Sequence, residues 1–82
     1  MKLYLLSQND NDNYDTYDSC LVCAENEEDA ITITPDGDTF IENCYNYNGG
    51  WAKKLSSITC VEIGEANERQ TRGVIISSFN AG

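Results

Sequence analysis

The chain of 82 residues contains no histidine, only one proline and only five lysine and arginine residues. Without histidine, a serine or cysteine nucleophile lacks its usual general base. The acidic residues are scattered along the sequence, and no two of them form a pair that suggests a carboxyl group of raised pKa. The sequence therefore predicts a protein that is not an enzyme.

Long apolar runs are absent as well. The first ten residues, "MKLYLLSQND", hold one lysine and a few apolar residues before the chain turns polar. A secretory signal needs about 7–15 consecutive apolar residues, and a membrane span needs about 20. We therefore expect a cytoplasmic protein that makes no membrane contact. Thiols stay reduced in that compartment, so disulfides are the least favoured interpretation of the cysteines.

Acidic residues outnumber basic ones by fourteen to five, which gives a formal net charge of −9. The imbalance lies in residues 1–42, which hold eleven of the acids and a single lysine. Nucleic acid and anionic membranes would repel such a chain, whereas a basic protein surface would attract it. The simpler alternative is that the acids only keep a small protein in solution. The candidate partner-binding residues are Asp10, Asp12, Glu25, Glu27, Glu28, Asp29 and Trp51.

The pattern of apolar residues predicts two strands and one helix in the first half of the chain. Residues 2–8 form a short apolar run, and residues 17–24 have the composition of a mostly buried strand. Asn26 is a helix-capping residue type, and acids fill the turn that would follow it, where the helix dipole favours negative charge. We expect this helix to run through Ile33 and to end near the turn at residues 35–37.

The second half of the chain predicts two more strands. Residues 36–56 mix aromatic residues with Asn and Gly, which suggests a short strand or an irregular excursion packed over the sheet. Residues 57–65 alternate, and residues 73–79 form a final apolar run. The two faces of the strand at 57–65 would hold Thr59, Val61 and Ile63, and Ile58, Cys60 and Glu62. The expected fold class is a single α+β domain over residues 1–82. It is an antiparallel sheet of four to five strands with one helix packed on a face, in the order β-β-α-(β)-β-β.

Four cysteines, Cys20, Cys23, Cys44 and Cys60, allow three interpretations. Together they could bind one structural zinc ion, which takes four ligands from Cys and His. Because residues three apart in a regular strand point to opposite faces, Cys20 and Cys23 could share an ion only if their strand bulged or ended near Val22. Alternatively, each thiol is a small buried apolar group. A redox pair at Cys20 and Cys23 would need a stabilised thiolate, which the neighbouring acids oppose.

Trp51 also allows two interpretations. It follows two glycines and lies near Tyr45 and Tyr47 in the sequence. Aromatic side chains dominate the hot spots of protein interfaces, so Trp51 could be a binding anchor. It could equally fill the core beneath an irregular segment.

Nearly the whole chain resembles a family of short, acidic proteins encoded by phages and prophages. The resemblance is carried by "MKLYLLSQND" at residues 1–10, "YDTYDSCLVCAENEEDA" at 14–30, "VEIGEA" at 61–66 and "SSFNAG" at 77–82. Small acidic phage proteins of this size include anti-CRISPR inhibitors, some of which bind zinc.

The resemblance implies an anti-defence inhibitor that acts in the cytosol of a bacterial host. Its partner would be a basic, nucleic-acid-binding surface of a CRISPR-Cas effector nuclease, blocked without turnover and without direct binding to nucleic acid. The alternative is an accessory phage protein that self-associates or binds a partner through Tyr45, Tyr47 and Trp51. Either protein could be a monomer or a dimer.

Overall fold

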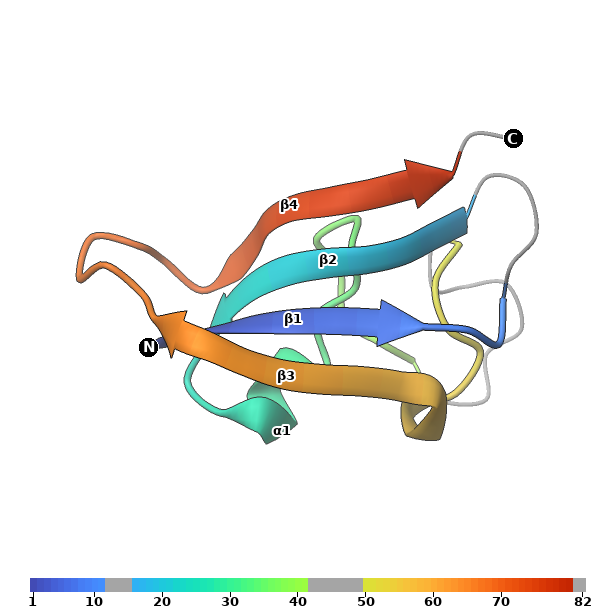
Figure 1. Cartoon of the computed structure of the whole chain (residues 1–82), viewed down its shortest axis with the longest axis horizontal. Coiled ribbons are helices and arrows are strands. Elements are labelled where there is room, and N and C mark those ends of the chain that lie inside the picture. Colours follow the sequence, from blue (N-terminus) through green and yellow to red (C-terminus); the bar gives the residue numbers. More distant parts are fainter. Residues whose placement is uncertain (12–15, 42–49, 81–82) are drawn as a thin grey trace.

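A computed structural model describes residues 1–11, 16–41 and 50–80 of the chain. Four strands, one short helix and one 3-10 turn make up its regular structure (Figure 1). They are β1 (Lys2–Gln8), β2 (Thr16–Ala24), α1 (Glu27–Ala30), η1 (Leu55–Ser57), β3 (Ile58–Glu65) and β4 (Gly73–Asn80). The strands form one sheet in the order β3-β1-β2-β4, and each neighbouring pair is antiparallel. The α+β fold class is therefore confirmed at this level.

The two central strands supply the middle of the core because their side chains alternate between the faces of the sheet. Tyr4 and Leu6 of β1 and Cys20 and Val22 of β2 are all buried in one cluster. The register places Leu6 opposite Cys20 on one side and opposite Cys60 on the other. The four predicted strands are thus present, each within one residue of its predicted ends.

One face of the sheet is covered by residues that follow β2. Ala30, Ile33, Phe40, Trp51 and Ala52 are buried in the same cluster as the side chains from β1 and β2. In Figure 1 these segments lie behind the strands, while the other face of the sheet is turned toward the reader. Within the described residues, the predicted excursion at 36–56 contains η1 but no fifth strand, since only the isolated bridge Ile33–Thr39 lies outside the four strands. Within residues 1–11, 16–41 and 50–80, the sheet therefore has one covered face and one face left largely open.

The helix is shorter than predicted, which corrects the expectation that it runs through Ile33. It ends at Ala30, and Phe40 N–H donates to the carbonyl of Thr32 in a turn-like segment (N···O 2.7 Å). Four β-branched residues in a row, at 31–34, are poor helix formers. Pro35 also disfavours the helical conformation at the residue before it. The apolar residues of this segment therefore reach the core from a turn and the isolated bridge at Ile33.

The predicted faces of β3 are confirmed up to Val61. Ile58 and Cys60 pack against the core, whereas Val61 is exposed on the opposite face, and Ile63 is exposed at the register shift that follows. Within the part of the chain that the structure describes, no helix is long and apolar enough to cross a membrane.

Candidate acidic interaction surface

The turn after β2 is built around a helix cap. The side-chain oxygen of Asn26 accepts a hydrogen bond from the backbone N–H of Asp29 (2.8 Å), as the sequence predicts for a capping residue. The cap leaves Glu27 and Glu28 in the first turn of α1 with their carboxylates exposed to solvent. Glu25, directly before the cap, is exposed as well. Three of the predicted partner-binding acids are therefore together and accessible.

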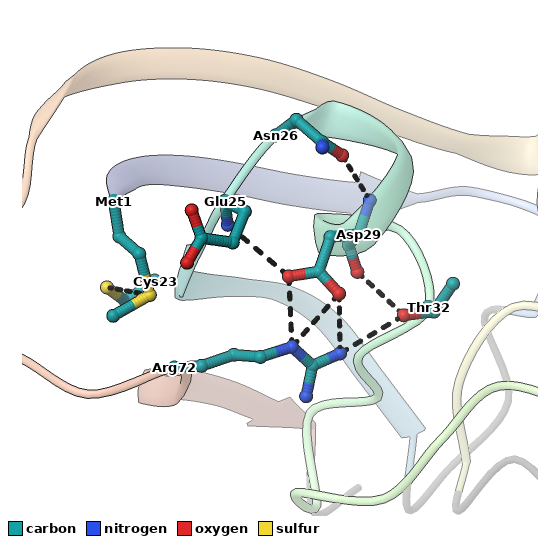
Figure 2. A network of polar contacts seen from close by, with 7 residues as sticks. All are labelled: Met1, Cys23, Glu25, Asn26, Asp29, Thr32 and Arg72. Atoms are coloured by element: carbon teal, nitrogen blue, oxygen red, sulfur yellow. Dashed lines mark hydrogen bonds and ion pairs between the residues drawn. The ribbon is translucent and has the colours of Figure 1, made fainter.

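Asp29 belongs to the same turn but is neutralised by a cation. Both oxygens of its carboxylate accept from Nε of Arg72 at 2.9 Å, and Oδ1 lies 2.8 Å from a terminal guanidinium nitrogen (Figure 2). The backbone N–H of Glu25 donates to the same carboxylate (3.3 Å). The hydrogen bond from Arg72 holds the pKa of Asp29 below its usual value. Asp29 therefore fastens the turn to the loop before β4.

Two further acids reach this region from β3. Glu65 lies opposite Lys2 in the sheet, and on the other side of Lys2 lies Ala24, the residue before Glu25. Nζ of Lys2 lies 3.2 Å from Oε1 of Glu62, and this hydrogen bond raises the pKa of Lys2. We call the five exposed carboxylates at this place the acidic corner: Glu25, Glu27, Glu28, Glu62 and Glu65.

Glu27 of α1 and Glu62 of β3 lie close enough to act on one common group, the hydroxyl of Tyr4. Burial raises the pKa of Tyr4, and Glu62 and Glu27 raise it further, so both carboxylates act on the same hydroxyl group. Among the described residues, Lys2 is the cation that acts on this group, and it is paired with Glu62. A shallow depression beside the corner is lined by Asn26, Glu27, Glu28 and Ile31. The arrangement can attract a cationic surface and offers carboxylate oxygens to Arg and Lys side chains.

The other predicted partner-binding residues lie elsewhere. Both carboxylate oxygens of Asp10 accept from the backbone N–H of Lys53 (3.1 Å each). Asp10 therefore connects the loop after β1 to the segment that follows the buried Trp51 and Ala52. Asp12 lies outside the described residues. Trp51 is 1% exposed and belongs to the core, which corrects its use as a surface anchor. Its Nε1 has no hydrogen-bond partner in the described part of the chain.

The structure separates the described cysteines. Cys20 is buried in the core cluster. Cys23 is buried too, three positions along a strand that pairs without interruption with β1, and its Sγ contacts Sδ of Met1 (3.9 Å). β2 pairs with β1 through Val22 without a shift in register, and the shift between Leu21 and Val22 in its pairing with β4 is taken up by the extra residue Ile75 of β4. The thiols of Cys20 and Cys23 therefore point to opposite faces of the sheet. Cys60 lies on the covered face with Leu6 between it and Cys20.

The environments of Cys20 and Cys60 favour protonated thiols. Burial raises the pKa of Cys20 to about 12. Burial and the nearby Glu27 raise that of Cys60 to about 11. Among the residues that the structure describes, no three His, Cys, Asp or Glu side chains lie close enough to hold a metal ion. Cys44 lies outside those residues, so the four-cysteine zinc site stays a prediction.

The sequence analysis missed Glu62 and Glu65 as parts of the acidic surface. They are about 35 positions from Glu27 in the sequence, and only the pairing of β3 with β1 brings them beside it. The one available signal was the placement of charged residues at the end of a predicted edge strand. No protein-family model, no curated protein and no solved structure matches this chain.

Proposed function

We propose that this protein is a non-enzymatic binding module whose acidic corner docks on a basic surface of another protein. The observation that carries the proposal is the concentration of five exposed carboxylates at a place where both nearby cations are already paired, Lys2 with Glu62 and Arg72 with Asp29. A carboxylate cluster of this kind steers an oppositely charged partner during diffusion and adds charge-assisted hydrogen bonds on contact.

The resemblance to acidic phage proteins directs the proposal to one class of partner. A nuclease that binds guide RNA or target DNA carries a basic channel for the phosphate backbone. The acidic corner would occupy part of such a channel and compete with nucleic acid for its Arg and Lys side chains. The proposed activity is stoichiometric occlusion of a CRISPR-Cas effector nuclease in the cytosol of a bacterial host. The protein itself would bind neither nucleic acid nor membranes, because both carry its own sign of charge.

The test is inhibition of DNA cleavage by a panel of purified CRISPR effector nucleases, with and without prior loading of guide RNA. We expect at least one nuclease to be inhibited at a ratio near one inhibitor per active site, and less strongly as salt rises. The variant Glu27→Gln/Glu28→Gln removes two charges from the acidic corner and preserves side-chain size. It should raise the concentration for half inhibition by about three- to tenfold.

The matched control is Asp18→Asn/Asp36→Asn, which removes the same charge from exposed positions on the β2 and β4 side of the sheet. This control should inhibit like the unchanged protein. If both double variants inhibited the nuclease equally poorly, inhibition would depend only on net charge and not on the acidic corner. If no nuclease of the panel is inhibited, the assignment of the partner is wrong.

A further inference from the structure

The face of the sheet that the described chain leaves open is apolar across its full width. Strand pairing places four aliphatic residues in one row, one from each strand: Val61, Leu5, Leu21 and Ile76. Directly opposed side chains in such a row lie about 4.5–5.5 Å apart, so the four form a continuous stripe. Leu5 is 42% exposed and Ile76 is 65% exposed, although both are large aliphatic residues.

Neighbouring rows complete a patch with a polar edge. On one side of the stripe, Ile63 and Ile75 are exposed at the two register shifts of the outer strands. On the other side lies a row of four hydroxyl groups: Thr59, Ser7, Ser19 and Ser78. An apolar centre with a polar rim is the organisation of a protein interface, and contiguous exposed apolar patches mark such surfaces. We call these rows together the open face.

We propose that two copies of this chain associate through their open faces. Two sheets that pack face to face lie about 10 Å apart and interdigitate their apolar rows. In a two-fold pair, each stripe would cross the stripe of the other copy, so the surface is complementary to itself.

Charge favours a second copy over an acidic or basic partner at this face. No residue of the apolar stripe is charged, and the carboxylate of Asp18, which accepts a hydrogen bond from Ser19 Oγ (3.5 Å), stands at the polar rim. The carboxylates of Glu25, Glu27 and Glu28 lie on the turn and helix that follow β2, away from the stripe. Two highly acidic chains can therefore meet with their like charges held on the outside of the pair.

The size of the sheet suits a dimer interface. The sheet lies across the two longer dimensions of the molecule, which measure 35 × 24 Å with the loops included (Figure 1). An interface of standard size buries about 800 Å² of each partner, so a dimer of that size would use most of this side of the molecule.

The edges of the sheet are less suited to association than its face. Both outer strands carry an extra residue, Ile63 in β3 and Ile75 in β4, where the register shifts. Such bulges disrupt the ladder and twist the edge, which discourages pairing with the edge of another sheet. Association through the face also leaves the acidic corner accessible, so this inference does not depend on the proposed function.

The experiment is the molar mass of the full chain measured by light scattering and sedimentation from about 1 µM to about 1 mM, the range of weak to moderate dimers. We expect a shift from 9.1 kDa to twice that mass. Dimerisation should strengthen as salt rises, because screening weakens the repulsion between two acidic chains. The variant Leu5→Thr lies on a central strand and should weaken the dimer at least about tenfold, since the lost side chain is counted twice.

The matched control is Ile41→Thr, which removes a side chain of similar exposure, 46%, from outside the sheet and should leave the dimer unchanged. Circular dichroism of both variants reports whether they remain folded. A chain that stays monomeric at all concentrations overturns the proposal. A Leu5→Thr variant that is folded and still fully dimeric also overturns it, because an edge or another surface must then be used.

Discussion

Trp51 shows how one side chain can serve the core of a domain that has few large apolar residues to bury. It lies against residues from the sheet and is the largest fully buried side chain among the described residues. We predict that Trp51→Ala lowers the free energy of unfolding by about 3–5 kcal/mol, because a large cavity would remain. Urea denaturation followed by circular dichroism measures the change. A variant that unfolds at the same urea concentration as the unchanged protein would contradict the core role.

The thiols can be tested at the same scale. Without metal, the raised pKa values of Cys20 and Cys60 predict that fewer than about one in a hundred of either thiol is ionised near pH 8. Iodoacetamide should therefore label them slowly in the folded protein, Cys60 before Cys20, and rapidly after unfolding. A four-cysteine zinc site would instead add about 63 Da to the native mass of the reduced protein, after loss of protons. Native mass spectrometry followed by peptide mapping separates the two outcomes.

At the scale of elements, the contact between Asp29 and Arg72 joins α1 to the loop before β4. The carboxyl pKa is lowered in the folded chain from its ordinary value of 3.8. The pair therefore stabilises the fold above that pH and is lost as the pH falls below it. Because the Arg72 side chain is 48% exposed, solvent screening limits the contribution to about 0.5–1 kcal/mol.

We predict that Asp29→Asn is less stable than the unchanged protein by this amount at neutral pH. The two proteins should converge in stability as the pH falls through the lowered pKa of the native carboxyl group. Urea denaturation at neutral and at acidic pH makes the comparison. The control Glu68→Gln removes the same charge from an exposed position outside this ion pair. If Asp29→Asn remained less stable than the unchanged protein by the same amount in acid, its effect would come from lost packing and not from the ion pair.

At the scale of the whole molecule, the acidic corner and the open face occupy different surfaces. We therefore expect their variants to act independently, as distant sites usually do. Leu5→Thr should change the molar mass and leave nuclease inhibition unchanged. Glu27→Gln/Glu28→Gln should weaken inhibition and leave the dimer intact. Salt provides a second test of this independence: raising it should weaken nuclease inhibition and strengthen dimerisation. A single variant that abolished both would show that the two surfaces are coupled.

The amino-acid sequence by itself determined the strands and the cap of the helix. Alternation at residues 57–65 predicted which side chains of β3 face the core, and Asn26 followed by acids predicted where α1 begins. These features depend on neighbours within a few positions, so local patterns suffice to predict them. The end of α1 was predicted too late because apolar spacing was given more weight than four β-branched residues before Pro35.

Only the tertiary structure decided which residues share a surface. The pairing of β1 with both β2 and β3 brings Glu62 and Glu65 beside the helix cap, and the same pairing aligns Leu5 with Val61 and Leu21. It also places Leu6 between Cys20 and Cys60. Such contacts join residues up to about 60 positions apart, and their register is set by burial of one whole face of the sheet. Local sequence patterns do not predict that register, so the acidic corner and the open face could be identified only in the folded structure.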